Sequence, residues 1–301
     1  MSALFVFCGA SVRFAGIAAV GSDRERKVDM DKKKRLNRLF GKDGKTIMVA
    51  LDGFGFSSHT AGVDFSVKNV KNLLKHGLNC ALVTYGQAQM FADDLLDVPT
   101  VLRVDGSVDV FDGEVPKTAQ FFDVTDALKL GADGVVCMTF PGGGQEREEF
   151  SHKMLTSLAK QGEEWNVPVL AETLPCSYPV LEKFPNSGNP DYIKTAARLG
   201  AEYGADVIKT RFTGDIETDR QIVENARRPT VALGGPKTDN ETYFRYVFNL
   251  MQAGVCGIAC GRNITQDKNP VGKVAALSAL IHEGKTVEEA LRIYEQVRSE
   301  E

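Results

Sequence analysis

Eight short apolar runs recur along the chain, and each is followed by a polar or glycine-containing corner and then by a segment with helical periodicity. Within the runs nearly every residue is apolar, rather than every second residue, which is typical of strands that are covered on both faces in a parallel sheet. Eight strand–helix units in a row predict an α/β fold that consists of a single (β/α)8 barrel, the TIM barrel. The predicted strands are residues 46–51, 79–84, 100–104, 134–139, 167–172, 205–210, 230–234 and 254–260.

The segments between the runs have the apolar spacing of amphipathic helices. In residues 190–204, for example, the side chains that fall on one side of a helix are Ile193, Ala196, Ala197 and Leu199. Several helices end at a glycine directly before the next run, as expected at a corner between a helix and a strand. A doubly wound sheet is the structural alternative, but the LDGFGFSS segment after the first run lacks the GxGxxG spacing of a dinucleotide-binding turn.

The two ends of the chain lie outside this pattern. Residues 1–22 are small and apolar with Arg13 in their middle, and residues 23–36 are rich in charge. The first segment lacks the charged start and uninterrupted apolar core of a secretion signal, and a cleaved transit peptide is the alternative. We expect residues 1–30 to form a poorly ordered extension and residues 31–301 to form the barrel, which begins with a short basic helix and ends with an extra amphipathic helix.

Composition narrows the class of protein. Hydrophobic residues make up 43% and charged residues 25% of the 301-residue chain, which is ordinary for a globular protein and excludes a disordered one. A formal net charge of −4 gives no basic surface for nucleic acid or for an anionic membrane, and no apolar run approaches the roughly 20 residues that span a bilayer. The six cysteines form no CxxC pair, so we expect buried thiols in a reducing compartment, the cytoplasm, and neither a disulfide framework nor a zinc site.

Polar residues at the carboxyl ends of the strands are the candidates for chemistry, because the active sites of such barrels lie at this end. Lys209 follows the apolar segment ADVI in the sixth run. Burial lowers the pKa of an ammonium group, and the resulting free amine is the nucleophile that attacks a carbonyl carbon. Asp52 follows the first run, where a carboxylate can move protons. A lysine that reaches solvent and an aspartate that caps a turn are the alternatives at these two positions.

Glycine-rich corners follow the seventh and eighth runs, as GGPKT at residues 234–238 and GRNIT at residues 261–265. Barrels often bind phosphate after these two strands, where backbone N–H groups converge on an anion. The sequence therefore predicts a phosphorylated substrate, with Lys237 and Arg262 adding positive charge at the site. Ordinary turns and solvated side chains are the alternative interpretation.

Other residues near strand ends carry groups that can transfer protons, although a structural hydrogen bond is the more common role of such groups. These further candidates are Tyr85, Asp105, Glu172 and Tyr178.

Taken together, these motifs resemble the class I (Schiff-base) aldolase family that includes deoxyribose-phosphate aldolase and archaeal-type fructose-bisphosphate aldolase. The resemblance covers about residues 33–298, and its most specific segments are ADVIKTRFTGD, PTVALGGPKT and AGVCGIACGRNITQDKNPVGKVAALSALIHEG. It implies a homo-oligomeric barrel enzyme that needs neither a metal nor another cofactor and acts on a small phosphorylated carbonyl compound. It also implies that Lys209 forms the Schiff base and that Asp52 assists proton transfer. The substrate phosphate would be held at the two glycine corners, by Gly234, Gly235, Lys237, Gly261 and Arg262.

Three positions depart from the family pattern. Gly53 replaces the histidine of the family's Asp-His-Gly strand end, the fourth run reads MTFPGGG instead of carrying His-Val-Asn, and Leu174 stands where bisphosphate aldolases carry an acid/base tyrosine. Glu172 lies on the same side of the strand as position 174 and is the predicted substitute for that tyrosine. These departures weigh against fructose 1,6-bisphosphate as substrate and favour the branch that resembles the autoinducer-2 thiolase, which also lacks the tyrosine.

The leading functional prediction is a carbon–carbon lyase that cleaves or forms a phosphorylated ketose or hydroxyketone through a lysine Schiff base. The first alternative is acyl transfer from a phosphorylated diketone to coenzyme A, in which the same amine or a thiol such as Cys176 or Cys260 takes part. The second alternative is a non-catalytic barrel that binds a phosphosugar.

Overall fold

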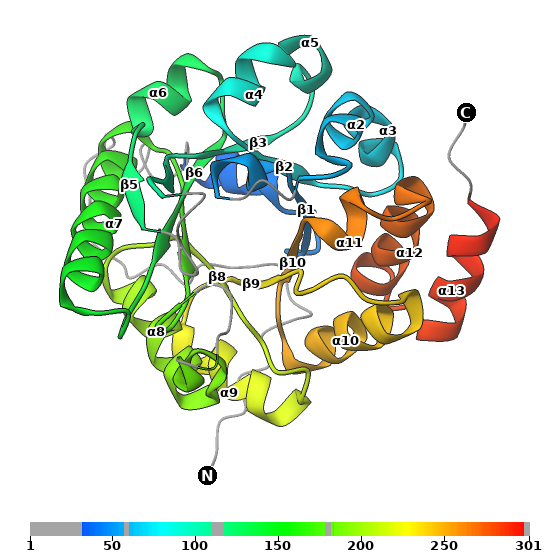
Figure 1. The fold of residues 1–301 in the computed structure, drawn as a ribbon. Helices are drawn as coiled ribbons and strands as arrows, with labels where there is room; N and C mark the ends of the chain where they lie inside the picture. Colours follow the sequence, from blue (N-terminus) through cyan, green and yellow to red (C-terminus); the bar gives the residue numbers. More distant parts are fainter. Residues whose placement is uncertain (1–31, 57–59, 110–116, 178–181, 183, 298–301) are drawn as a thin grey trace, which may run out of the picture.

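Eight parallel strands close into a barrel around a common axis, with helices outside them (Figure 1). The computed structural model describes residues 32–56, 60–109, 117–177, 182 and 184–297. Around the barrel the strands follow the order β1-β10-β9-β8-β7-β6-β3-β2. Their bounds are β1 (Thr46–Ala50), β2 (Cys80–Val83), β3 (Thr100–Arg103), β6 (Gly134–Thr139), β7 (Val169–Thr173), β8 (Val207–Thr210), β9 (Thr230–Leu233) and β10 (Gly257–Cys260). The predicted (β/α)8 barrel is confirmed, with each strand inside its predicted run or within one residue of it.

The helices between the strands bury one face against the barrel. In α8 (Pro190–Glu202) the predicted apolar face is confirmed, because Ile193, Ala196 and Ala197 are buried and Leu199 is half-buried. An aspartate side chain caps the first turn of several helices, such as Asp215 before α9. The helices are α2 (Val63–Lys68), α3 (Val70–Lys75), α4 (Tyr85–Met90), α5 (Ala92–Leu95), α6 (Val124–Lys129), α7 (Gln145–Trp165), α8 (Pro190–Glu202), α9 (Ile216–Ala226), α10 (Asn240–Ala253), α11 (Arg262–Thr265), α12 (Pro270–His282) and α13 (Val287–Gln296).

Both predicted additions to the barrel are present. A helix over residues 32–39 lies at the amino-terminal end of the strands, where Leu39 is fully buried and Leu36 packs beside it. The extra C-terminal helix, α13, packs on α12 and α10 at the edge of the molecule (Figure 1). The predicted disorder of residues 1–30 concerns a segment outside the described residues.

Side-chain alternation along the strands decides what fills the barrel. One layer of apolar side chains points to the axis, including Val101, Leu170 and Val207, while their neighbours in sequence point to the helices. Two residues further along a strand, the side chain points to the axis again. This period therefore brings the side chains at positions 103, 172 and 209 into the barrel, one layer closer to its carboxyl end.

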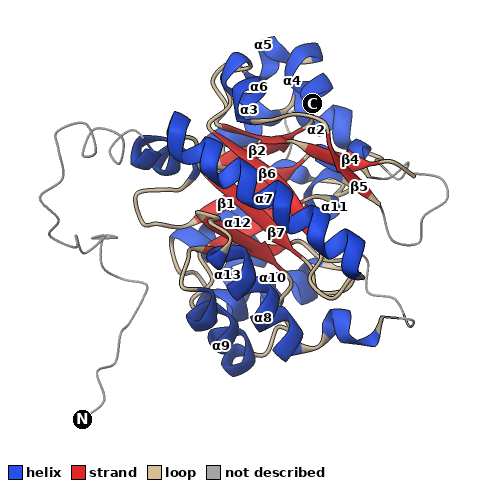
Figure 2. Cartoon of the chain, turned by 90° about the vertical axis from the view of Figure 1, so that its left-hand side faces the viewer, coloured by secondary structure: helices blue, strands red, loops and turns tan. Residues whose placement is uncertain are grey.

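A two-stranded antiparallel hairpin extends beyond the carboxyl end of β3 (Figure 2). It consists of β4 (Asp105–Ser107) and β5 (Thr118–Gln120). Sequence analysis missed this hairpin, because its strands have three residues each and include glycine and aspartate, which are depleted in strands. In the described part of the chain, no helix is both long enough and apolar enough to cross a membrane.

Candidate active site

The side chain of Lys209 lies inside the barrel, where it is only 4% exposed. Its Nζ is 2.9 Å from Oε2 of Glu172, which is 2% exposed. The two residues are direct partners in the register between β7 and β8, so the parallel pairing of these strands sets their side chains side by side. Two predicted site residues from different strands therefore meet in an ion pair that is shielded from water.

Arg103 joins this ion pair to the opposite wall. Its Nε donates to Oδ2 of Asp52 at 2.8 Å, and its Nη1 donates to Oδ1 of Asp105 at 3.2 Å. Its Nη2 donates to the same Glu172 oxygen that accepts from Lys209. The predicted site residue Asp52 is therefore linked to the lysine through Arg103 and Glu172 rather than in contact with it.

Sequence analysis missed Arg103, which is 3% exposed and contacts three carboxylates. The signal was present, because a charged residue interrupts the otherwise apolar run TVLRV at residues 100–104. Charged side chains are almost never fully buried unless they are paired. An arginine in a predicted barrel strand therefore requires carboxylate partners, and the candidates were already at the neighbouring strand ends.

The network separates the proton affinities of its carboxylates. Burial by itself would raise the pKa of Glu172, but the charges of Lys209 and Arg103 outweigh it and lower this pKa from 4.5 to about 2. Burial raises the pKa of Asp105 from 3.8 to about 6, against the opposing charge of Arg103. Burial disfavours the guanidinium charge, but Asp52, Glu172 and Asp105 together raise the pKa of Arg103 well above its usual value. Glu172 is thus ionised at neutral pH, whereas the pKa of Asp105 is moved toward neutrality.

The two glycine corners lie next to each other, because β9 and β10 are neighbours in the barrel. Asn263, which is buried, ties the corners together: its Nδ2 donates to the carbonyl oxygens of Gly234 and Pro236 at 2.8 and 2.9 Å. Its Oδ1 accepts from the Thr238 N–H at 3.1 Å. Asn263 lies inside the GRNIT segment, but sequence analysis gave it no role.

Not every backbone N–H at these corners is available to a ligand. The Gly234 N–H donates to the carbonyl oxygen of Ala259 at 3.1 Å, so it belongs to the barrel ladder. A Cβ at Gly234 would lie 2.8 Å from Cα of Cys260, so this glycine is required by close backbone approach. The N–H groups of Gly235, Gly261 and Arg262 donate no backbone hydrogen bond within the described residues. These three amides, and that of Lys237, which likewise donates no backbone hydrogen bond there, are left for an anion.

The two basic side chains of the corners are both exposed. Lys237 Nζ contacts the carbonyl oxygen of Gln266, and an Arg262 guanidinium nitrogen lies 3.5 Å from the carbonyl oxygen of Gly235. Neither has a carboxylate partner in the described part of the chain, so the charge of each remains available to an anion.

A small apolar cluster forms a wall of the barrel's carboxyl end. Met138, Phe140 and Leu174 are buried there, and Phe56 and Leu233 pack against them. The Phe56 ring centre is 5.0 Å from Cζ of Arg103, so the cluster borders the charged network. Leu174, at the position of the family tyrosine, is part of this wall and offers no proton to the site.

The remaining candidate residues lie in different environments. Asp105 belongs to the Arg103 network, whereas the Tyr85 ring stacks on Phe122 with centroids 4.3 Å apart. Tyr178 lies outside the described residues. Burial raises the pKa of Cys260 to about 11, and burial also raises the pKa of Cys176. A nucleophilic thiol needs a lowered pKa, so these two cysteines do not fit the thiol form of acyl transfer.

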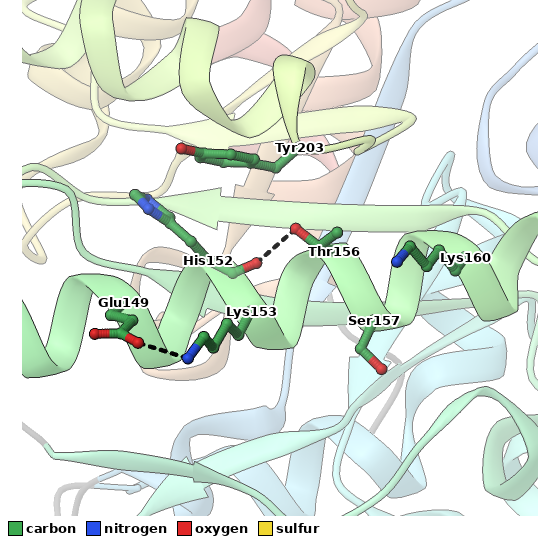
Figure 3. A pocket seen from close by; sticks show the side chains of 7 residues that line it. All are labelled: Glu149, His152, Lys153, Thr156, Ser157, Lys160 and Tyr203. Carbon is green, nitrogen blue, oxygen red and sulfur yellow. Dashed lines mark hydrogen bonds and ion pairs between the residues drawn. The ribbon is translucent and has the colours of Figure 1, made fainter.

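A cavity of about 520 Å³ lies on the outer helix layer rather than at the carboxyl ends of the strands. Its lining residues come from α7, apart from Tyr203 just after α8 (Figure 3). The rings of His152 and Tyr203 face each other there with centroids 4.5 Å apart. It contains none of the residues of the charged network. The described residues also contain no group of three or more His, Cys, Asp or Glu side chains placed to hold a metal ion.

Comparisons of the sequence with known proteins identify the family of the chain. The model of the DeoC/LacD family of aldolases matches residues 30–267. An uncharacterized aldolase of Saccharolobus solfataricus is 30% identical over 272 residues, which cover 86% of this chain and 97% of the relative. A class 1 fructose-bisphosphate aldolase of Thermoproteus tenax is 29% identical, over 85% of this chain and 97% of that protein. A 3-hydroxy-5-phosphonooxypentane-2,4-dione thiolase of Escherichia coli is 28% identical, over 89% of this chain and 88% of that protein.

Solved structures of similar fold include an archaeal fructose-1,6-bisphosphate aldolase with its catalytic lysine covalently bound to a carbinolamine intermediate. It is 26% identical and has a TM-score of 0.74 over 83% of this chain and 99% of its own. A structure of a Schiff-base-forming fructose-1,6-bisphosphate aldolase is 27% identical, with the same TM-score and coverage. The predicted class of enzyme, a Schiff-base-forming aldolase, is confirmed by these findings. The protein belongs to the DeoC/LacD family of aldolases.

Proposed function

We propose that Lys209 is the lysine that forms the Schiff base, and that the substrate is a phosphorylated ketose or hydroxyketone. The observation that carries this proposal is the buried contact of 2.9 Å between the Lys209 amine and the Glu172 carboxylate, at the carboxyl end of the barrel. This contact holds the Lys209 nitrogen inside the barrel, where in its uncharged form it can attack a carbonyl carbon.

The reaction divides into an addition and a cleavage. The Lys209 nitrogen bonds to the ketone carbon, and loss of water from the carbinolamine leaves a protonated iminium. The hydroxyl on the β carbon loses its proton, the bond between the α and β carbons breaks, and its electron pair moves toward the iminium, so an aldehyde leaves and an enamine remains. The enamine carbon then takes up a proton, and hydrolysis of the iminium releases the ketone product and the free lysine.

Glu172 is the proposed acid/base group of these steps in place of the family tyrosine. Its carboxylate lies beside the reacting nitrogen and is held in place by Arg103, so its position allows it to accept the proton of the substrate hydroxyl during cleavage. In this proposal Asp52 acts through Arg103, orienting the guanidinium and with it Glu172.

The substrate phosphate would bind at the paired glycine corners. Three backbone amides, of Gly235, Gly261 and Arg262, and the exposed charges of Lys237 and Arg262 support this assignment. Gly234 would shape the site rather than bind the anion, because its own N–H donates to Ala259.

The test is the Lys209→Met variant, which keeps the length and apolar body of the side chain but removes the amine. We expect cleavage of phosphorylated ketoses to fall by roughly 1,000-fold or more, which equals about 4 kcal/mol of transition-state stabilisation. Lys153→Met is the matched control, because Lys153 is on the outer surface of α7, paired with Glu149. Full activity of Lys209→Met would contradict the proposal.

Acyl transfer to coenzyme A remains the second candidate, because Leu174 is not a proton donor and a thiolase is among the relatives. Product formation from a phosphorylated diketone that depends on coenzyme A would support it, whereas a lyase ignores coenzyme A. The buried thiols of Cys80, Cys137, Cys176 and Cys260 form no disulfide within the described residues, which fits the cytoplasm as location. The homo-oligomer stays a prediction, to be checked by light scattering.

A further inference from the structure

We propose that the aldehyde half of the substrate is uncharged and has an aromatic or similarly bulky apolar body. This inference rests on the proposed function, because it concerns the fragment that leaves when the Lys209 Schiff base is cleaved. It is drawn from a second cavity, of about 220 Å³, at the carboxyl end of β2 and β3. Its lining includes the side chains of Phe54, Tyr85, Arg103, Asp105, Phe121 and Phe122.

The cavity lies across the barrel from the proposed phosphate site. In the closed order of eight strands, β3 is four strands away from β9, so the two face each other. The glycine corner after β9 would hold the phosphate, and β3 carries Arg103 into the opposite wall. β2 is likewise four strands away from β8, which carries Lys209, so a substrate anchored by its phosphate after β9 and bonded to Lys209 would direct its other half toward β2 and β3.

Four of the eight side chains that line this cavity are aromatic. The rings of Tyr85 and Phe122 stack on each other with an interplanar angle of 3°. Phe54 and Phe121 are 49% and 56% exposed, so apolar surface at this cavity is open to a ligand. A cavity of about 150 Å³ is enough for benzene, so this one has room for a substituted ring.

The charges at the cavity do not favour a second phosphate. Arg103 and Asp105 are the charged residues that line it within the described chain, and they pair with each other at 3.2 Å. The network behind them contains two cations, Arg103 and Lys209, against three carboxylates. An anionic aldehyde fragment would therefore meet no net positive charge here, whereas an apolar fragment removes aromatic surface from water.

The test uses the aldol reaction in the direction of synthesis, with dihydroxyacetone phosphate as the donor and aldehydes of different charge as acceptors. The enamine carbon of the donor bonds to the aldehyde carbon, the carbonyl electron pair moves to oxygen, and that oxygen takes up a proton. Water then hydrolyses the iminium. We expect kcat/KM for phenylacetaldehyde to exceed that for glyceraldehyde 3-phosphate by about tenfold or more.

Variants of the aromatic lining show whether the cavity causes this preference. Phe121→Ala changes an exposed side chain and should lower kcat/KM for phenylacetaldehyde by about fivefold, and Phe122→Ala by more, with little change for glyceraldehyde 3-phosphate. Tyr192→Ala, an exposed aromatic residue at the start of α8, is the control and should change neither value.

Borohydride reduction with dihydroxyacetone phosphate alone separates this inference from the proposed function. An adduct on Lys209 together with equal or better use of glyceraldehyde 3-phosphate would overturn the inference and leave the proposed function standing. The absence of any adduct with phosphorylated ketones would overturn both. An adduct with a preference that Phe121→Ala and Phe122→Ala leave unchanged would also overturn the assignment to this cavity.

Discussion

At the scale of single residues, the chemistry depends on which carboxylates keep their charge inside the barrel. Glu172 stays ionised because two cations contact one of its oxygens, while Asp105, with one cation partner, has a pKa near the physiological range. Opposite pKa shifts of neighbouring acids are typical of active sites, where one group must accept a proton that another retains. Arg103 is the residue on which this separation depends.

Replacing Arg103 should therefore change the pH dependence of the reaction and not only its rate. In Arg103→Met the pKa of Glu172 loses one of its two lowering charges and rises, so the acid limb of kcat/KM should move up by about one pH unit or more. Arg103→Lys restores a positive charge but not the guanidinium that bonds to three carboxylates, so the acid limb should lie between those of the wild type and Arg103→Met. A pH–rate profile identical to that of the wild type would contradict this role. Circular dichroism shows whether both variants fold.

Asp105 should make the protein less stable as the pH rises through its range. Its pKa is raised from 3.8 to about 6 in the folded state, so the folded state binds more protons than the unfolded chain between these values. The free energy of unfolding therefore falls by up to about 3 kcal/mol between pH 4 and pH 6.5. Glu172, with its lowered pKa, has the opposite effect, which is confined to pH values below 4.5.

Urea unfolding at pH 5 and pH 7.5 measures this effect of Asp105. Asp105→Asn cannot ionise, so its stability should change less between the two pH values than that of the wild type. Asp93→Asn, at an exposed site on α5, is the control and should keep the wild-type difference. An equal difference in the wild type and Asp105→Asn would rule out this carboxyl as the source.

At the scale of elements, the two loops after β9 and β10 act as one unit because Asn263 bonds to both. Asn263→Ala removes three hydrogen bonds and leaves the buried carbonyl group of Gly234 without its side-chain donor. We expect KM for a phosphorylated ketose to rise by about tenfold with a much smaller change in kcat, since the amine and its carboxylate lie on other strands. Asn249→Ala, which removes one hydrogen bond to the Gly214 carbonyl on another loop, should leave KM unchanged. A loss confined to kcat would contradict a phosphate site at these corners.

The elements also show where sequence patterns suffice. Near-continuous apolar runs predicted all eight barrel strands, because burial on both faces leaves a strong signal in each strand. The β4–β5 hairpin has no such signal, since its two strands have only three residues each and most of these residues are polar and partly exposed. This hairpin belongs to the side of the barrel that would receive the aldehyde half of the substrate, so the missed element is also a part of the candidate site.

At the scale of the whole molecule, strand order turns separate motifs into a site. The sequence predicted Lys209, Glu172 and Asp52 as strand-end candidates, and parallel register places the first two in contact. That Asp52 reaches the lysine only through Arg103 could not be predicted, because it depends on which side chains point to the axis at one level of the closed barrel. Which amides of the glycine corners are available to an anion could not be predicted either, because it depends on the hydrogen bonds between β9 and β10.

The identity of the Schiff-base lysine is the central claim, and more than one lysine of this chain is buried. Lys273 is fully buried on α12, where its Nζ lies 4.9 Å from the Phe244 ring centre and 3.6 Å from Asp267. Its Nζ donates to Oδ1 of Asn240 at the start of α10, so it lies between α10 and α12, outside the ring of strands, whereas Lys209 lies inside the barrel.

Peptide mapping after borohydride reduction with dihydroxyacetone phosphate tests this claim most directly. We predict a single reduced adduct, on the peptide that contains Lys209, which is lost in Lys209→Met. An adduct on Lys273, or on any lysine other than Lys209, would contradict the assignment.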